Sequence, residues 1–294
     1  MRNIVKTLFV AGLASAAAGP VVAQEIDLGV NLGLSGYEGD LSAVTLVDRV
    51  GELRSSFGAY GRVAVMEGLA VRAYVQRSEI RGDDAIRPTS VTRNLSFTSK
   101  VFELGVSGEY YPFRMSLPVQ PYVSLGVSVY NFNPEVDYNG RLVELQPLGT
   151  EGQGMPGFAP RYKLTRMAVP VGVGFTRSLG RSFVVGAEFN MRALFFDHLD
   201  DVSGDYVNYF TLADGEGVEG STGNGPLAAA LADRTAELTG GEPRDLPTGR
   251  PRGNPAHDDW FYTGTITIGY RIGSGMFSGA GYRDYRRYNR CYTF

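Results

Sequence analysis

The chain has 294 residues, of which 28 are basic and 31 acidic, so its formal net charge is −3. This weakly acidic balance gives no electrostatic case for a nucleic-acid partner. No continuous apolar run of about 18 residues is present, which excludes a helical membrane protein, whereas 39 glycines and 17 tyrosines suit the crowded interior and the interfaces of a small barrel.

The N-terminus has the pattern of a secretory signal peptide. Two basic residues precede an apolar stretch over residues 8–18, and small residues favour cleavage before Gln24. A membrane anchor is the alternative, but the apolar stretch is too short to span a bilayer. A lipid anchor would need a cysteine just after the cut. The one cysteine is Cys291, which also excludes an intramolecular disulfide. We therefore expect a leader at 1–23 that directs export through the inner membrane.

After Gln24, apolar and polar residues alternate in eight segments. Side chains of a strand point alternately to its two faces, so each segment presents one apolar and one polar face. In the last segment, Trp260 and Tyr262 lie on one side, with Thr263 and Thr265 on the other. A membrane-barrel strand needs roughly 9 to 11 residues and carries aromatic residues at the interfaces. The expected strands are 26–36, 57–65, 69–78, 97–111, 121–132, 166–177, 183–195 and 260–272.

The connections between these segments alternate in length. Those after the second, fourth and sixth segments are short, whereas the others are expected as external loops at about 37–56, 79–96, 133–163 and 197–258. Bacterial outer-membrane barrels alternate short periplasmic turns with long external loops in this way. The sequence therefore predicts an all-β fold: an eight-stranded antiparallel transmembrane β-barrel over 24–272, surrounded by outer-membrane lipid, with both termini in the periplasm.

Charges of both signs fall on the inward side of the predicted barrel. Buried charges require partners, and eight strands leave an interior that side chains alone can fill. We therefore expect an arginine and glutamate lattice in the lumen. The alternative is an aqueous pore or a proton path, although a pore for solutes normally needs a wider barrel. The expected lattice residues are Arg62, Arg72, Glu103, Glu109, Arg166, Glu188, Arg192 and Arg271.

No catalytic, cofactor-binding or metal site is expected. Some outer-membrane barrels are hydrolases, but the two histidines, His198 and His257, have no nucleophile motif beside them, and we expect both on the loop surface. The longest loop contains four neighbouring aspartates, Asp197, Asp200, Asp201 and Asp205. They could bind calcium through their oxygens, yet they lack the spacing of a known calcium loop. Residues 226–238 predict a short helix within the same loop.

Three segments resemble one family of small outer-membrane barrels. The first is Tyr37-Glu38-Gly39-Asp40-Leu41, and the last is Asp200-Asp201-Val202-Ser203 with Tyr206. The most specific lies in the third long loop, over 145–154, and contains Gln146, Pro147, Gly149, Thr150, Glu151 and Gly152. These landmarks resemble the group that includes PorG of the type IX secretion system, found in Bacteroidota. Turn-forming and polar residues in this loop predict a structural cap over the barrel mouth, which we favour, or a binding site.

The resemblance implies a non-enzymatic part of the type IX protein secretion machinery, which exports folded cargo across the outer membrane. It also implies that the barrel anchors a periplasmic ring of PorK-like and PorN-like proteins to that membrane. The periplasmic tail, 273–294, is basic and aromatic: either it is a disordered end, or it docks on an acidic partner. The tail residues expected to dock are Arg283, Arg286, Arg287 and Arg290.

Two other functions stay open at the level of sequence. One is a small outer-membrane binding or transport barrel with no secretion role. The other is a hydrolase at the barrel rim that would use one of the two histidines. The sequence leaves open whether the lumen conducts and whether Cys291 is free or joined to another chain.

Overall fold

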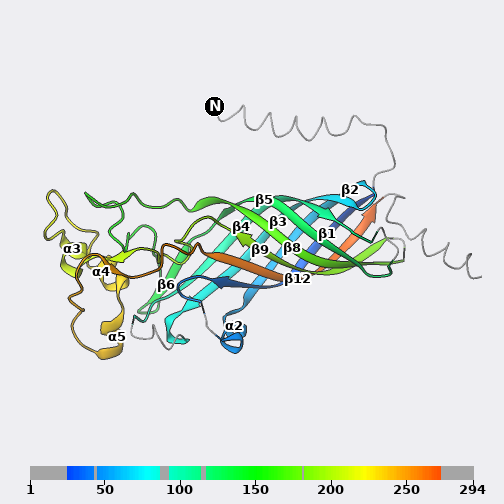
Figure 1. The fold of residues 1–294 in the computed structure, drawn as a ribbon. Coiled ribbons are helices and arrows are strands. Elements are labelled where there is room, and N and C mark those ends of the chain that lie inside the picture. Colours follow the sequence, from blue (N-terminus) through cyan, green and yellow to red (C-terminus); the bar gives the residue numbers. More distant parts are fainter. Residues whose placement is uncertain (1–24, 43–44, 87–92, 114–116, 181, 273–294) are drawn as a thin grey trace, which may run out of the picture.

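The structure is a computed structural model that describes residues 25–42, 45–86, 93–113, 117–180 and 182–272. The expected leader at 1–23 and the expected tail at 273–294, with its arginines, lie outside the described residues. Tilted strands form a long barrel, and the long connections gather at one of its ends (Figure 1). We refer to the other end as the short-turn end.

Eight strands form a closed antiparallel barrel. Each strand pairs with the next barrel strand along the chain, and the last pairs with the first, from Ile26 opposite Ile272 to Glu38 opposite Trp260. The predicted eight-stranded antiparallel fold is therefore confirmed. The barrel strands are β1 (Ile26–Glu38), β2 (Arg54–Met66), β3 (Leu69–Asp83), β4 (Ser96–Tyr110), β5 (Gln120–Asn131), β8 (Thr165–Leu179), β9 (Phe183–Ala193) and β12 (Trp260–Ile272).

Some strands are longer than the sequence predicts at the end that carries the long connections. The predicted third strand ends at Ser78, whereas β3 continues to Asp83 beside β4. Outward side chains in this extension, such as Glu79 and Arg81, are polar, so the apolar alternation stops before the strand does. Backbone pairing needs no apolar outer face. The two strands therefore project beyond the apolar part of the barrel.

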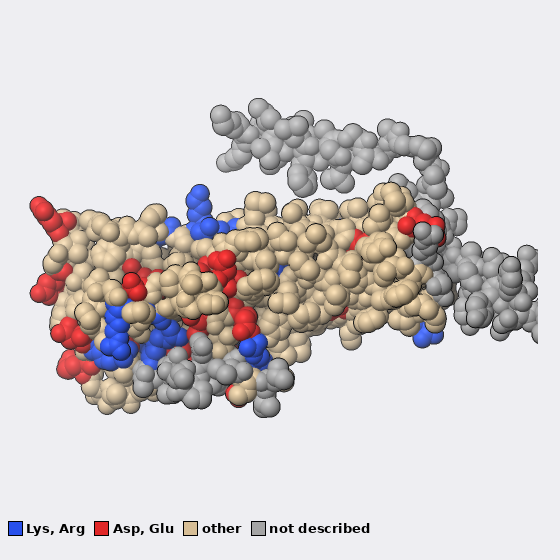
Figure 2. Space-filling model, in the orientation of Figure 1, with Lys and Arg blue, Asp and Glu red and all other residues tan. Residues whose placement is uncertain are grey.

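The outward side chains of the barrel form a continuous apolar belt. Leu32, Leu125, Met167 and Ile266, from four different strands, expose between 58% and 67% of their surface. Charged side chains are few over the barrel strands and gather over the long connections (Figure 2). Lipid tails can cover such a belt, because a closed barrel pairs its strands on both sides and leaves no open backbone edge. The barrel is therefore of the outer-membrane type.

The long connections fold into a loop cap, which we define as the described residues within 39–53, 84–95, 132–164 and 194–259. A hairpin of β6 (Pro134–Tyr138) and β7 (Arg141–Glu144) extends the sheet beyond β4. Among the described residues, no helix is long and apolar enough to cross a membrane. The other elements of the cap are α2 (Leu46–Glu52), η1 (Asp84–Ile86), β10 (Asp205–Tyr206), α3 (Tyr209–Asp214), α4 (Pro226–Ala232), α5 (Thr235–Thr239) and β11 (Arg250–Pro251).

The helix predicted over 226–238 is present as two short helices, α4 and α5. The break lies at Asp233, whose carboxylate accepts a hydrogen bond of 3.1 Å from the amide of Thr235 at the start of α5. The helix α3 is not predicted from the sequence. Its start is capped by the side chain of Asn208, which accepts hydrogen bonds from the amides of Phe210 and Thr211.

A charge in the middle of the apolar belt should destabilise the inserted barrel. Val127 of β5 exposes 57% of its surface and lies opposite Val106 of β4. Val127→Arg should lower the free energy of unfolding by about 2–4 kcal/mol, because the guanidinium would enter the hydrocarbon layer without a partner. Urea unfolding in lipid vesicles, followed by the fluorescence of Trp260, measures the change.

Leu142→Arg is the matched control for this prediction. Leu142 exposes 64% of its surface but lies on β7 in the loop cap, so a charge there stays in water. The control should unfold at the same urea concentration as the parent protein. Equal destabilisation by both substitutions would contradict the assignment of the belt to lipid.

Candidate functional site

Buried charges fill the half of the lumen nearest the short-turn end. Arg62 of β2 and Arg72 of β3 lie directly opposite each other, and strand alternation turns both side chains inward. Glu109 of β4 lies between them: its Oε2 is 2.6 Å from Nε of Arg62, and its Oε1 is 2.6 Å from Nε of Arg72. The Glu109 side chain is fully buried and accepts a further hydrogen bond of 2.7 Å from Tyr111. One glutamate thus offsets the repulsion between two arginines that adjacent strands bring together.

This lattice crosses the lumen to the opposite wall. Nη2 of Arg72 lies 2.6 Å from Glu188 of β9, and Tyr122 of β5 contacts both, accepting from Arg72 at 2.9 Å and donating to Glu188 at 2.6 Å. At the short-turn end, Arg271 of β12 pairs with Asp27 at 2.8 Å and also with Glu25. Side chains from facing walls therefore meet inside the barrel and fill it.

A separate ion pair lies farther from the short-turn end. Arg192 of β9 is 3.1 Å from Glu103 of β4 and donates a hydrogen bond of 2.6 Å to Thr263. Tyr74 donates to the same glutamate at 2.9 Å. A polar cavity of about 10 Å³ lies beside these groups and is also lined by Gln76. A space of this size holds about one water molecule.

The structure gives every predicted lattice residue except Arg166 an ion pair inside the lumen, with Arg192 and Glu103 forming a pair apart from the rest. The guanidinium carbon of Arg166 lies 4.0 Å from the centre of the Phe196 ring, and this arginine forms no ion pair with a described residue. Arg166 points inward near the barrel mouth, where the facing side chains are aromatic rather than acidic, so its place in the lattice is corrected. The predicted lattice also omits Asp27, Tyr111 and Tyr122. Their inward parity and aromatic or acidic character could have identified them.

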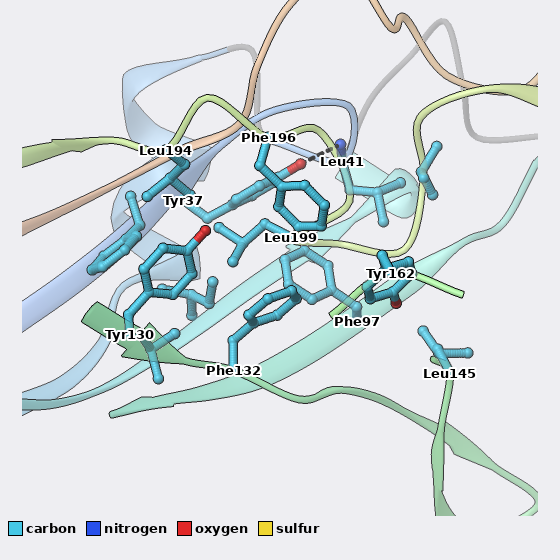
Figure 3. Packing of buried hydrophobic residues seen from close by; sticks show 14 of the residues in the cluster. Tyr37, Leu41, Phe97, Tyr130, Phe132, Leu145, Tyr162, Leu194, Phe196 and Leu199 are labelled. Atoms are coloured by element: carbon cyan, nitrogen blue, oxygen red, sulfur yellow. Dashed lines mark hydrogen bonds between the residues drawn. The ribbon is translucent and has the colours of Figure 1, made fainter. Parts of the chain in front are cut away.

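Aromatic rings from the barrel strands and the loop cap pack together at the barrel mouth and form an aromatic layer (Figure 3). The ring centre of Tyr130 in β5 lies 5.7 Å from that of Phe132 and 6.0 Å from that of Phe261. Phe132 in turn packs against Tyr162 and Phe196, which belong to the third and fourth long connections. Buried leucines from the loop cap surround these rings. The barrel mouth is therefore packed like a protein core.

The loop motif of the third long connection binds the fourth long connection through buried polar contacts. Thr150 donates a hydrogen bond of 2.6 Å to Asp201, and Glu151 lies 2.8 Å from Arg252. The same glutamate accepts the amide hydrogens of Ser203 at 3.0 Å and of the glycine that follows it. All of these partners belong to the fourth long connection. The arrangement is that of a structural cap, because the buried oxygens of the motif already have partners inside the protein.

Backbone shape accounts for the glycines of this motif. Gly149 and Gly152 have φ angles of 63° and 81°, which L side chains rarely adopt. A Cβ atom on Gly149 would also lie 2.4 Å from the carbonyl oxygen of Gln153. Gln146 donates a hydrogen bond of 2.7 Å to the carbonyl of Tyr162, whereas Pro147 is exposed. The motif residues therefore serve to hold a tight turn in place.

His198 belongs to the same buried cluster, which corrects its predicted place on the loop surface. Its side chain is 25% exposed, lies 3.4 Å from Glu151, and packs against the rings of Tyr162 and Phe196. Burial opposes the charge of Glu151, but the hydrogen bond from His198 and the charge of Arg252 outweigh it and lower the pKa of Glu151 to about 2. Burial likewise disfavours charged His198, yet Glu151 raises its pKa. The other histidine is exposed.

The four aspartates of the longest connection face different partners. Asp201 accepts hydrogen bonds from Thr150 and Tyr162, whereas Asp200 accepts one from Tyr37 of β1, and Asp205 is exposed. In the part of the chain that the structure describes, no three His, Cys, Asp or Glu side chains are grouped so that they could hold a metal ion.

A family model describes much of the chain. Residues 5–217 match the model described as Domain of unknown function (DUF6089). This match includes the first seven barrel strands and the loop motif. No curated protein matches the sequence.

Solved structures of small outer-membrane barrels share low sequence identity with this chain. Pseudomonas aeruginosa outer membrane protein OprG is 13% identical, with 86% of this chain and 97% of that one covered and a TM-score of 0.40. A major outer membrane protein from Thermus thermophilus is 12% identical, with coverages of 85% and 100% and a TM-score of 0.41. Escherichia coli outer membrane protein W is 16% identical, with coverages of 85% and 98% and a TM-score of 0.32.

Proposed function

This chain belongs to the family described as Domain of unknown function (DUF6089), and on that premise we propose that it is a closed, non-enzymatic scaffold of the outer membrane. The observation that carries the proposal is the filled lumen. Glu109 joins Arg62 and Arg72, and Arg72 reaches Glu188 on the facing wall. A barrel whose two walls are joined by charged side chains is suited to holding partners together and unsuited to passing solutes.

The proposed location and orientation follow from the two kinds of surface. The apolar belt places the strands in lipid, and the short turns would face the periplasm, as in other barrels of this type. The N-terminal 1–23 segment would direct export through the inner membrane. The loop cap would then lie outside the cell, and periplasmic partners would contact the short turns or the tail.

The proposed role is an anchoring component of the type IX protein secretion machinery, with PorK-like and PorN-like ring proteins as partners. The resemblance of the three sequence landmarks to PorG-like barrels supports this role. Two of these landmarks meet in the structure, because Thr150 of the loop motif bonds Asp201 of the third landmark. The second and third landmarks are therefore in contact within the loop cap.

A clean deletion in the native host tests the secretion role. Cargo should accumulate in the periplasm and disappear from the medium, and the full-length gene should restore export. A gene that lacks 274–294 should insert a barrel without restoring export if the tail docks on the ring. Normal export by the deletion strain would rule out a role in type IX secretion. The protein would then be a scaffold for partners outside this machinery.

Single-channel recording separates the scaffold from a transport barrel. Purified protein in a planar bilayer should give no steady conductance, because the lattice and the aromatic layer obstruct the lumen. Steady conductance by the full chain would instead support a small binding or transport barrel with no secretion role. The rim-hydrolase alternative requires that the parent protein hydrolyse a lipid or a peptide. It also requires that substitution of His198 and His257 abolish this hydrolysis.

A further inference from the structure

Two buried carboxylates share one tyrosine hydroxyl where the loop cap meets the barrel. The hydroxyl of Tyr37, at the end of β1, lies 2.5 Å from Oδ2 of Asp200 and 3.1 Å from Oδ1 of Asp259. Asp200 is 1% exposed and Asp259 is fully buried. The first belongs to the fourth long connection, and the second ends that connection immediately before β12. The cluster therefore joins both ends of the longest loop to the barrel rim.

The contacts in this cluster require a proton beyond that of the hydroxyl. A tyrosine has one O–H hydrogen and can donate it to one carboxylate only. The other oxygens of the two carboxylates already accept backbone amides, Asp200 from Val202 at 2.8 Å and Asp259 from Leu199 at 2.7 Å. If Asp259 is protonated, it donates to the tyrosine oxygen while Tyr37 donates to Asp200, and every contact is satisfied. If both carboxylates are ionised, one short contact becomes a repulsion.

The charges around the cluster do not neutralise it. Neither Asp200 nor Asp259 forms an ion pair with a described residue. Arg93 is held by Asp84 at 2.7 Å, and Arg252 is held by Glu151 at 2.8 Å. The other titratable and charged groups that face the two aspartates are Asp40 from the first connection, Arg93 from the second, Tyr162 from the third, Asp197, His198, Arg234 and Arg252 from the fourth, and Tyr130 from the barrel.

The backbone is built to allow this close approach. A Cβ atom on Gly39 would lie 1.9 Å from Oδ1 of Asp259, so the first connection can pass the carboxylate only because it has a glycine there. The amide of Leu41 also donates to the Tyr37 hydroxyl, at 3.4 Å (Figure 3). Gly39 and Leu41 belong to the sequence landmark at 37–41, and Asp200 belongs to the landmark at 200–203.

We propose that Tyr37, Asp200 and Asp259 form a proton-dependent latch that fastens the loop cap to the barrel rim while the carboxylate pair holds a proton. The latch weakens when the pair loses that proton, because two buried negative charges then face the same hydroxyl. Opening would expose the aromatic layer beneath. This inference does not depend on the proposed secretion role.

The directions of the pKa shifts agree with this latch. Burial raises the pKa of Asp200 above the ordinary aspartate value, against the hydrogen bonds from Tyr37 and Val202. Burial and then the charge of Asp200 raise the pKa of Asp259. Burial also raises the pKa of nearby Asp197 to about 7. A raised pKa in the folded state means that the folded cap binds protons more tightly than the open one. The stabilisation is therefore complete at acidic pH and is lost as pH rises through the folded-state pKa.

The test measures protease access to the loop cap of the full-length protein in phosphatidylcholine vesicles, at about pH 6 and about pH 9. Opening that releases one proton becomes easier by up to about tenfold per pH unit between the open-state and the folded-state pKa, and the effect levels off above the folded-state pKa. The cap of the parent protein should therefore be cut faster at high pH. Asp259→Asn and Asp200→Asn each put a neutral amide in the pair, and both should show a smaller acceleration than the parent, because only the titration of His198 and Asp197 then remains. The fluorescence of Trp260, the one tryptophan of the chain, checks that each barrel has folded.

Asp258→Asn is the matched control, because Asp258 is exposed and lies next to Asp259. This variant has the same change from carboxylate to amide, and its cap should still be cut faster at high pH, as in the parent. Comparison at equal pH also cancels the pH dependence of the protease itself. A parent cap that is cut at the same rate at both pH values would overturn the latch, as would full acceleration in a folded variant of either buried aspartate.

Discussion

Glu109→Gln should destabilise the barrel by about 3–5 kcal/mol, the usual cost of removing one partner of a buried ion pair. The substitution removes the one carboxylate that lies between Arg62 and Arg72, each within 2.6 Å of it. The side chains of the two arginines are only 5% and 6% exposed, so water cannot replace the lost charge. Both cations would then face each other across adjacent strands. Urea unfolding in lipid vesicles measures the loss.

Glu67→Gln is the control for the lattice prediction. Glu67 lies in the tight turn between β2 and β3, near the same end of the barrel, and is exposed. Its replacement should leave the urea midpoint unchanged, because an exposed carboxylate is solvated by water. A loss below about 1 kcal/mol for Glu109→Gln would mean that water reaches the arginines. That result would favour the aqueous lumen over the filled one.

The barrel could be predicted from sequence because its pattern is local. In each strand, the alternation of apolar and polar residues shows which side faces lipid. In β12, outward and buried residues alternate from Trp260 to Ile272. Inward charges such as Arg72 and Glu188 follow from the same parity. Their pairing does not, because it depends on register and on which strands face each other across the lumen. Arg166 shares the inward parity yet meets Phe196, and no local signal separates it from the arginines of the lattice.

The loop cap could be predicted only in outline because its contacts join distant segments. His198 has the sequence context of an exposed loop residue, and its burial is set by Tyr162 and Glu151 of another connection. The Tyr37 contact with Asp259 closes a separation of 222 residues. The sequence landmarks include Tyr37, Glu151 and Asp200, but not Asp259 or Tyr162. The landmarks could not say that these residues contact one another or that two carboxylates share one hydroxyl.

Glu151→Gln should loosen the loop cap by about 3–5 kcal/mol, because it leaves buried Arg252 without the carboxylate that offsets its charge. The pKa of Glu151 is lowered to about 2, so this stabilisation is present above the ordinary glutamate pKa and is lost as pH falls through the folded-state value. The latch has the opposite dependence. At neutral pH, protease should therefore cut the cap of Glu151→Gln faster than that of the parent.

Exposed Glu219, at a loop tip of the cap, supplies the control, and Glu219→Gln should behave as the parent. The Glu151 variant should still form a barrel, because the lumen lattice lies on other residues and does not use this glutamate. If urea unfolds the barrel and the cap together in Glu151→Gln, at a midpoint lowered for both, then the two parts form one cooperative unit. A separate, earlier loss of the cap would instead mean that the barrel mouth can open while the membrane-spanning wall stays folded, which is the condition that the latch requires.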